Sequence, residues 1–386
     1  MRLKAIKYSE FDGSAQVWIL EELTLGTVNL LVGKNATGKS RTLNIISSLA
    51  TLLAGTTKPG LSGKYEATFD HDGQVFRYSL NFKDQQVVKE QVRIGDVLRL
   101  DRGEGGEGSI YAEKVDGGSM IPFQTPQNEA AAVARQDSIQ HPYLGPLSEW
   151  GQSVRHLRFG THFGQGSLMM LVEKGNYPLD VTGSDAPPVI FHKSFKKYAE
   201  PFKQQIIHDM GRIGYPLDDI AIKLPFSIRL QDVLPGELRC LTVKEKGLNG
   251  HTDQHSMSQG MYRALSVLIL IAYFQHAEKA ACLLIDDIGE GLDFDRSCRL
   301  IEVLRERASE IKAQLILSTN DRFVMNGVPL EEWSVLQREG SLVRALNVMN
   351  SPALFEDFKF TGLSNFSFLE LDFAAESPKE EVANRE

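Results

Sequence analysis

Alternating and helically spaced apolar residues follow one another along most of the chain and predict an α/β fold. Apolar stretches at residues 3–8, 15–20 and 27–32 are separated by short polar turns, which is typical of strands. Residues 42–49 then carry apolar side chains at helical spacing. The beginning of the chain therefore predicts three strands and a helix in that order.

The stretch from residue 60 to residue 115 predicts an antiparallel lobe. Apolar side chains from Phe76 to Phe82 alternate with polar ones, and Asp72-Gly73 just before them is a favoured two-residue hairpin turn. Further strand-like stretches lie at 87–94, 97–100 and 110–115, with the Gly- and Glu-rich residues 103–109 as a hairpin tip. We assign residues 1–125 to this N-terminal lobe.

The middle of the chain, residues 126–235, predicts a mostly helical insertion. Proline residues punctuate its beginning up to residue 146, and a second Pro- and Gly-containing loop lies at 175–188. Its clearest helix places five large apolar residues on one face: Phe195, Tyr198, Phe202, Ile206 and Met210.

The last third of the chain predicts a second lobe at 236–350 and a closing segment at 351–386. Strands are expected at 237–245, 281–285 and 314–319, and a buried helix at 264–274. The segment 351–373 is rich in Phe, which either completes the core or docks a partner. The polar residues 374–386 are expected to be disordered.

Bulk composition narrows the class of protein. The chain has 386 residues, 42% of them hydrophobic and 24% charged, as in soluble globular proteins. A net charge of −8 argues against a surface that coats nucleic acid indiscriminately. The three cysteines show no metal-ligand spacing, and no apolar run is long enough to cross a bilayer. A cytoplasmic protein with reduced thiols is expected.

A phosphate-binding loop stands between the third strand and the first helix. The residues from Gly33 to Ser40 read G-x-x-x-x-G-K-S. Glycine lets the backbone N–H groups wrap a polyphosphate, the lysine neutralises the β and γ phosphates, and the serine hydroxyl binds Mg²⁺. We predict that ATP contacts Gly33, Lys34, Asn35, Ala36, Thr37, Gly38, Lys39, Ser40 and Arg41.

Two later strands end in polar residues that suit the same ligand. The apolar run 281–285 ends at Asp286 and Asp287, and buried carboxylates at a strand end are costly unless they hold a metal or protons. We predict that Asp286 holds Mg²⁺ together with Ser40 and that Asp287 orients or deprotonates the attacking water. Asn320, which follows the strand at 314–319, is placed to sense the γ-phosphate, so the predicted catalytic residues are Lys39, Asp287 and Asn320.

A serine and a glycine precede the buried helix. The Ser258 hydroxyl and the Gly260 N–H can both bond a phosphate oxygen at a helix N-terminus. A Ser-x-Gly sequence is equally able to serve as a plain helix cap. The nucleotide contact is preferred because of the two motifs above.

These motifs resemble, in this order, those of an ABC-type AAA ATPase of the SMC, RecF and OLD group. The phosphate loop is similar to the Walker A motif, residues 257–260 to the signature motif, residues 284–287 to Walker B, and residues 291–293 to the D-loop. The resemblance covers most of the first 60 residues and residues 235–325. It implies a homodimer, or a higher oligomer, in which Ser258 and Gly260 of one copy close over the ATP held by Lys39 of another.

Two positions depart from the family pattern. Asp287 stands where the group most often has Glu, and Asn320 stands where it usually has His. A group misplaced by about 1 Å can lose roughly 100-fold in rate. We therefore expect slow hydrolysis.

Three functions are compatible with this site. The leading hypothesis is a nucleotide-dependent switch or sensor that docks or restrains a separate effector, a nuclease or toxin, in bacterial anti-phage defence. Only 66 residues follow Asn320, so the Toprim nuclease that ends many OLD proteins is expected to be missing. The alternatives are a nucleotide-binding scaffold that scarcely hydrolyses ATP and a RecF-like DNA-binding ATPase in DNA repair. The cations that would support DNA binding are Arg155, Arg158, Lys193, Lys196, Lys197 and Lys203.

Overall fold

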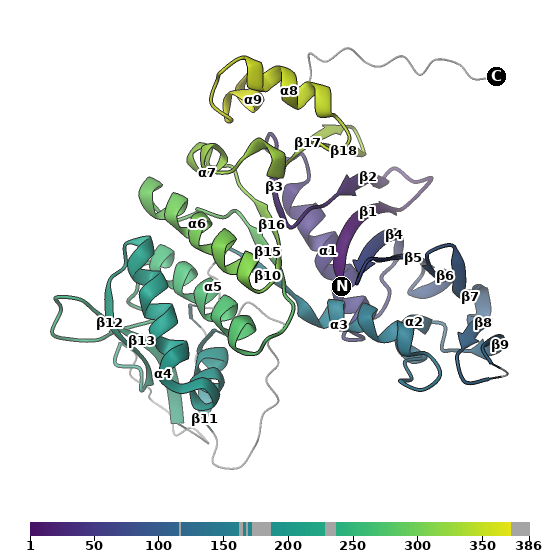
Figure 1. The fold of residues 1–386 in the computed structure, drawn as a ribbon, viewed down its shortest axis with the longest axis horizontal. Coiled ribbons are helices and arrows are strands. Elements are labelled where there is room, and N and C mark those ends of the chain that lie inside the picture. The colour runs from purple at the N-terminus through teal and green to yellow at the C-terminus, as the bar shows by residue number, and fades with distance from the viewer. Residues whose placement is uncertain (116, 162–164, 167–168, 172–186, 228–236, 372–386) are drawn as a thin grey trace.

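The computed structural model describes residues 1–115, 117–161, 165–166, 169–171, 187–227 and 237–371. Most of the predicted loop at 175–188 and all of the predicted tail at 374–386 lie outside these residues. Within the described chain, one long sheet joins an antiparallel lobe to a core flanked by helices, and a smaller sheet lies beside the helical end (Figure 1).

The elements are as follows. The strands are β1 (Arg2–Glu10), β2 (Trp18–Thr24), β3 (Val28–Val32), β4 (Ser62–His71), β5 (Gln74–Lys83), β6 (Gln86–Ile94), β7 (Val97–Arg102), β8 (Glu107–Ala112), β9 (Ser119–Gln124), β10 (Val154–Arg158), β11 (Met169–Leu171), β12 (Leu217–Lys223), β13 (Glu237–Glu245), β14 (Thr252–Asp253), β15 (Cys282–Asp286), β16 (Gln314–Ser318), β17 (Trp333–Glu339) and β18 (Leu342–Leu346). The helices are α1 (Lys39–Leu53), α2 (Ala131–Ala134), α3 (Gly145–Ser153), α4 (Pro187–Ile213), α5 (Gln259–His276), α6 (Phe294–Glu310), α7 (Arg322–Gly327), α8 (Pro352–Phe360) and α9 (Ser367–Glu370).

The large sheet has 14 strands in the order β10-β15-β16-β3-β17-β18-β2-β1-β4-β5-β6-β7-β8-β9. Within the run β10-β15-β16-β3-β17 all strand pairs are parallel, and within the run from β2 to β9 all pairs are antiparallel. The hairpin β17–β18 connects the two parts by pairing with β3 on one side and β2 on the other. The predicted α/β class with an antiparallel lobe is confirmed.

Each face of the core sheet carries its own hydrophobic core. Successive side chains of a strand point to opposite faces, so Leu283 and Ile285 of β15 lie in the cluster with α4, α5 and α6, whereas Leu284 lies in the cluster with α1 and α3. The helix α5, predicted as buried, buries every residue from Gly260 to Ala272 and lies in the first of these clusters. The helices α1 and α5 therefore cover opposite faces of the sheet.

Local sequence signals in the lobe are confirmed, with small shifts at element ends. The turn Asp72-Gly73 joins β4 to β5 with positive φ angles of 51° and 81°, as a type I′ hairpin requires. The second predicted strand begins later than expected: Ala15 lies in a turn, and β2 runs from Trp18 to Thr24.

The segment 126–235 contains the predicted helices and also strands that belong to the sheets. The strand β10 pairs in parallel with β15 in the core, and β12 pairs with β13 across the predicted boundary at residue 235. Its long helix α4 buries Phe202, Ile206 and Met210 as predicted, but is kinked at Ala199 (φ 55°), two residues before Pro201. The sequence-based boundaries at 126 and 235 therefore stay a prediction.

A buried ion pair attaches the beginning of this segment to the lobe. Glu90 and Arg102 are both fully buried, with their charged atoms 3.6 Å apart. The Glu90 carboxylate accepts hydrogen bonds from the backbone N–H groups of Ala131 (2.6 Å) and Ala132 (3.0 Å), and Arg102 Nη2 donates to the carbonyl of Pro126 (2.8 Å). Burial raises the pKa of Glu90, and its two amide donors and Arg102 oppose that rise.

We expect Arg102→Met to lower the free energy of unfolding by about 3–5 kcal/mol, because it leaves the Glu90 carboxylate buried without its counterion. Chemical denaturation measures this loss. The control is Lys64→Met, which breaks the exposed Lys64–Glu66 pair (2.7 Å) of the same lobe and should cost less than about 1 kcal/mol. Equal effects of the two substitutions would contradict the structural role of the buried pair.

Candidate ATP site

The phosphate loop leaves β3 at Val32 and enters α1 at Lys39. Gly38 has a φ of 106°, and a Cβ on Gly33 (φ 153°) would lie 2.6 Å from the carbonyl oxygen of Leu336, so both positions require glycine. The buried Lys39 side chain folds over the loop, and its Nζ donates to the carbonyls of Gly33 (2.7 Å) and Lys34 (3.1 Å). Burial lowers the pKa of Lys39, and Asp287 and Asp286 oppose this.

The other predicted nucleotide residues lie on this loop and its exit. Lys34, Asn35 and Ala36 are exposed at its tip, and the Thr37 hydroxyl donates to the carbonyl of Lys34 (2.9 Å). On the first turn of α1, Arg41 is paired with Glu10 and lies over the Trp18 ring at 4.4 Å from its centroid. These contacts within the chain stabilise the conformation of the loop.

The two predicted magnesium ligands meet at the end of β15. Ser40 Oγ donates to Asp286 Oδ1 over 3.0 Å, although the residues are 246 positions apart in the chain. Ser318 Oγ, at the end of β16, donates to the same carboxylate oxygen over 2.5 Å. A hydroxyl and a carboxylate oxygen are the hard ligands that Mg²⁺ takes alongside phosphate oxygens and water, so the donor set fits this ion.

Ser318 was not among the predicted site residues. Its position as the last residue of an apolar strand that ends in polar residues is the signal that could have found it. Besides bonding Asp286, its hydroxyl accepts a hydrogen bond from the backbone N–H of Asp287 (3.0 Å). Ser318 thus connects the two acids through one side chain.

The predicted catalytic acid lies directly beyond Asp286 in a constrained backbone. Asp287 has a φ of 55°, which is uncommon outside glycine and recurs at functional sites. Burial raises the pKa of Asp287, as does the charge of Asp286, while Lys39 opposes the rise. Asn320 Nδ2 donates to Asp287 Oδ1 (3.3 Å), so the two predicted catalytic residues that follow β15 and β16 are brought together.

The edge strand β10 adds residues that sequence reasoning had assigned to DNA contact. Arg158 is the register partner of Asp286, and its Nη2 donates to Asn44 Oδ1 of α1 over 2.7 Å. Arg155, on the opposite face, is buried and donates to the carbonyls of Gln152 (2.6 Å) and Val154 (2.7 Å). The prediction that Arg155 contacts nucleic acid is therefore wrong, because a buried guanidinium cannot reach phosphates.

The signature residues lie on the α5 side of the sheet. Ser258 is exposed and caps α5, with its Oγ accepting from the N–H of Met261 over 3.2 Å. Gly260 is buried against the D-loop, where an added Cβ would lie 2.3 Å from the carbonyl oxygen of Gly291. Glycine is needed here for packing within one chain, in addition to any contact with phosphate.

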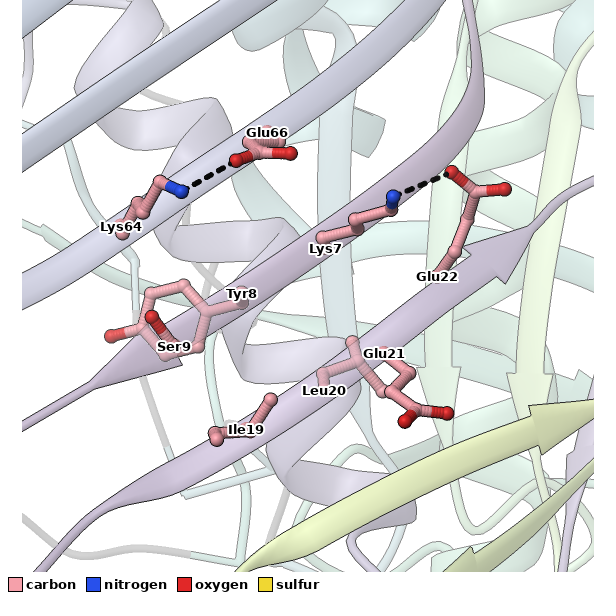
Figure 2. A pocket seen from close by; sticks show the side chains of 9 residues that line it. All are labelled: Lys7, Tyr8, Ser9, Ile19, Leu20, Glu21, Glu22, Lys64 and Glu66. Atoms are coloured by element: carbon pink, nitrogen blue, oxygen red, sulfur yellow. Dashed lines mark ion pairs between the residues drawn. The ribbon is translucent and has the colours of Figure 1, made fainter. Parts of the chain in front are cut away.

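An open groove elsewhere on the lobe has the character of a solvated sheet face. It lies along β1, β2 and β4, with an accessible volume of about 440 Å³ (Figure 2). Four of its charged side chains pair with each other, Lys7 with Glu22 at 3.4 Å and Lys64 with Glu66 at 2.7 Å, and Glu21 pairs with Arg344 at 3.3 Å. Such self-neutralised pairs leave little charge for a ligand.

A model of a known family covers the part of the chain that carries these motifs. The family model described as "AAA domain, putative AbiEii toxin, Type IV TA system" matches residues 28–326, well over half of the chain. The chain belongs to this AAA family. No curated protein matches this AAA chain in sequence.

Solved structures identify the fold of this AAA protein. The SMC head bound to the C-winged helix domain of ScpA matches with a TM-score of 0.53 and 12% identity, over 91% of this chain and 100% of that one. The SMC head domain from Thermotoga maritima matches with a TM-score of 0.45 and 14% identity, over 90% and 99% of the two chains. The family match confirms the predicted AAA family, and the first structure shows that the chain has the fold of an SMC head, as the predicted ABC-type architecture requires.

No helix among the described residues of this AAA protein combines the length and the apolar character that crossing a membrane requires.

Proposed function

We propose that this AAA ATPase is a homodimeric switch that binds ATP with Mg²⁺, hydrolyses it slowly and docks or restrains a separate effector. The observation that carries the proposal is the meeting of Lys39, Ser40, Asp286 and Asp287 at the carboxyl ends of neighbouring strands. Ligands of open α/β sheets bind at this edge. The arrangement supplies a cation that can neutralise phosphates, oxygen ligands that can bind a metal and a carboxylate that can accept a proton from water.

Each residue has a separate task in this proposal. Lys39 would exchange its carbonyl partners for phosphate oxygens, and Ser40 and Asp286 would hold Mg²⁺, which would neutralise charge on the phosphates. Asp287 would accept a proton from the attacking water, a role favoured by the burial that raises the pKa of its carboxyl. Asn320 holds Asp287 in position and can also sense the γ-phosphate.

A second copy of the chain completes the site. Ser258 and its neighbour Gln259 are exposed at the start of α5, on the face of the sheet opposite α1. In a head-to-tail pair, the hydroxyl of Ser258 and the free N–H groups of that helix turn would close over the ATP held by the partner's phosphate loop. ATP then acts as the ligand that joins the two copies.

The effector is proposed from the comparisons and from the closing helices. The description of the family names a toxin of a Type IV TA system, and the matched SMC head is bound to a domain of another protein. The family description supports a role in bacterial anti-phage defence, and the bound SMC head supports docking of a separate protein, which we propose is an effector such as a nuclease or toxin. In α8 and α9, Phe355, Phe358 and Phe368 complete the core, whereas Phe360 is 89% exposed and available for docking.

Two measurements on the unaltered protein test the switch. Analytical ultracentrifugation should show a monomer without nucleotide and a dimer with ATP and Mg²⁺. Phosphate release should be measurable but well below about 10 per second, the median for enzymes. A protein that stays monomeric at saturating ATP contradicts the composite site, and a faster rate contradicts the proposed slow turnover.

DNA binding is the second candidate function, and the structure leaves fewer cations for it. Besides the burial of Arg155, Lys203 is engaged by Glu200 (2.8 Å) and Asp219 (3.1 Å). Lys196 and Lys197 remain exposed on α4. We expect little ATP-dependent DNA binding at low salt. Strong binding that falls with salt and is weakened by Lys196→Glu with Lys197→Glu would instead favour the RecF-like function.

A further inference from the structure

One buried cation connects the signature helix to both segments that surround the catalytic acid. Arg263 lies one turn after Gly260 on α5 and is 4% exposed. Its Nη1 donates to the carbonyl of Glu290 (2.7 Å), and its Nη2 donates to the carbonyl of Thr161 (3.0 Å). The planar guanidinium is suited to bridging two acceptors in a fixed geometry.

Both acceptors belong to segments that contact Asp287. The N–H of Glu290 donates to the carbonyl of Asp287 over 3.0 Å, so the first acceptor lies in the turn that begins at the acid. Thr161 follows Gly160, and a Cβ on Gly160 would lie 3.2 Å from Asp287 Oδ2. The position of Arg263 is therefore coupled to the surroundings of the Asp287 carboxylate on two sides.

The same turn packs against the signature helix without spare room. A Cβ on Gly291 would lie 2.5 Å from Arg263 Nη1, and one on Gly260 would lie 2.3 Å from the carbonyl oxygen of Gly291. Close-packed interfaces of this kind transmit a displacement instead of absorbing it. A shift of the N-terminal end of α5 must therefore move the D-loop, and a shift of the D-loop must move the N-terminal end of α5.

We infer that Arg263 is a positioning residue that couples the two ATP sites of the dimer. The inference rests on the proposed head-to-tail pairing. In that pairing, Ser258 and Gly260 serve the partner's nucleotide, whereas Asp287 serves the nucleotide bound to its own chain. Arg263 connects these two halves within one chain, so closure of α5 over the partner's ATP sets the position of Asp287 at the other site.

Arg263→Lys tests this coupling with the charge retained. Lysine has a single ammonium in place of the planar fork and a shorter overall reach, so it cannot bridge the carbonyls of Glu290 and Thr161 in the same geometry. We expect the Hill coefficient of hydrolysis to fall from near two, the maximum for two sites, toward about one. The rate at saturating ATP should fall by roughly 10- to 100-fold, since Asp287 is then misplaced. The affinity of the monomer for ATP, measured by calorimetry on dilute protein, should stay unchanged.

Two further variants keep the test decisive. Arg305→Lys is the control, because Arg305 lies on α6 and pairs with Glu332 at 2.7 Å, away from the D-loop. Gly291→Ala perturbs the same contact while keeping Arg263, and should lower the Hill coefficient in the same way. The melting temperature shows whether Arg263→Lys folds. If it does not fold, Gly291→Ala decides the test.

The inference is overturned if folded Arg263→Lys or Gly291→Ala retains the Hill coefficient and maximal rate of the parent. It is equally overturned if the Hill coefficient falls in the Arg305→Lys control as well. A parent protein that binds no ATP, or that never dimerises with it, shows instead that the proposed function has failed. The two failures are therefore distinguishable.

Discussion

Asp287→Asn should slow ATP hydrolysis by about 100- to 10,000-fold and make the ATP-bound dimer the prevailing species. The amide cannot accept the proton of the attacking water, but it has the same shape as the carboxylate. Asn also tolerates the left-handed backbone that Asp287 adopts at φ 55°, so the loop need not rearrange. Lys39, Ser40 and Asp286 remain in place to bind ATP and Mg²⁺.

Phosphate release and sedimentation in ATP measure the two parts of this prediction. The matched control is Asp295→Asn, which removes the same charge from an exposed position on α6 and should leave both the rate and the assembly unchanged. A monomeric Asp287→Asn protein in saturating ATP would refute nucleotide-driven pairing. Undiminished hydrolysis would show that Asp287 is not the base.

Lys39→Ala should reduce the rate of hydrolysis by about 100- to 1,000-fold. A loss of this size is typical when one preorganised hydrogen-bond donor to the negative charge of a transition state is removed. ATP binding should weaken as well, because the buried amine is held next to the loop carbonyls where phosphate oxygens would lie. Unlike Asp287→Asn, this variant should stay monomeric in ATP. The opposite assembly states of the two variants separate loss of binding from loss of chemistry.

The control for Lys39→Ala is Lys58→Ala, an exposed lysine beyond α1 whose partner Glu129 lies 3.7 Å away. Calorimetry with ATP and Mg²⁺ and a phosphate-release assay check both proteins. Hydrolysis that survives Lys39→Ala would come from another site or a contaminant. It would also favour the nucleotide-binding scaffold among the functions predicted from the sequence.

Features decided by neighbouring residues were predictable. The phosphate loop requires glycine at Gly33 and Gly38 because of local backbone geometry, and the structure has those conformations. The hairpin at Asp72-Gly73 follows from the same kind of constraint. The apolar face of α4 was predicted from its period, but its kink at Ala199 was not, although Pro201 nearby is a known cause of such breaks.

Features decided by distant contacts were not predictable. The strand β10 reads Val-Arg-His-Leu-Arg, with too many charges for an interior strand, and only its pairing with β15 places it at the edge of the core. Arg155 and Arg158 are alike in sequence, yet alternation places one in the core and the other on the face of the proposed Mg²⁺ ligands. The contact of Ser318 with Asp286 likewise depends on the order of β15 and β16 in the sheet.

The sequence by itself determined the kind of chemistry: a loop for phosphates, oxygen ligands for a metal and an acid at a strand end. These follow from residue types and short spacings, which constrain the backbone locally. Only the tertiary structure decided which side chains share one site, such as Ser40 with Asp286 across 246 positions, and which bridge two segments, as Arg263 does. The physical reason is that such contacts depend on strand order and close packing, and neither is encoded in any short stretch of the chain.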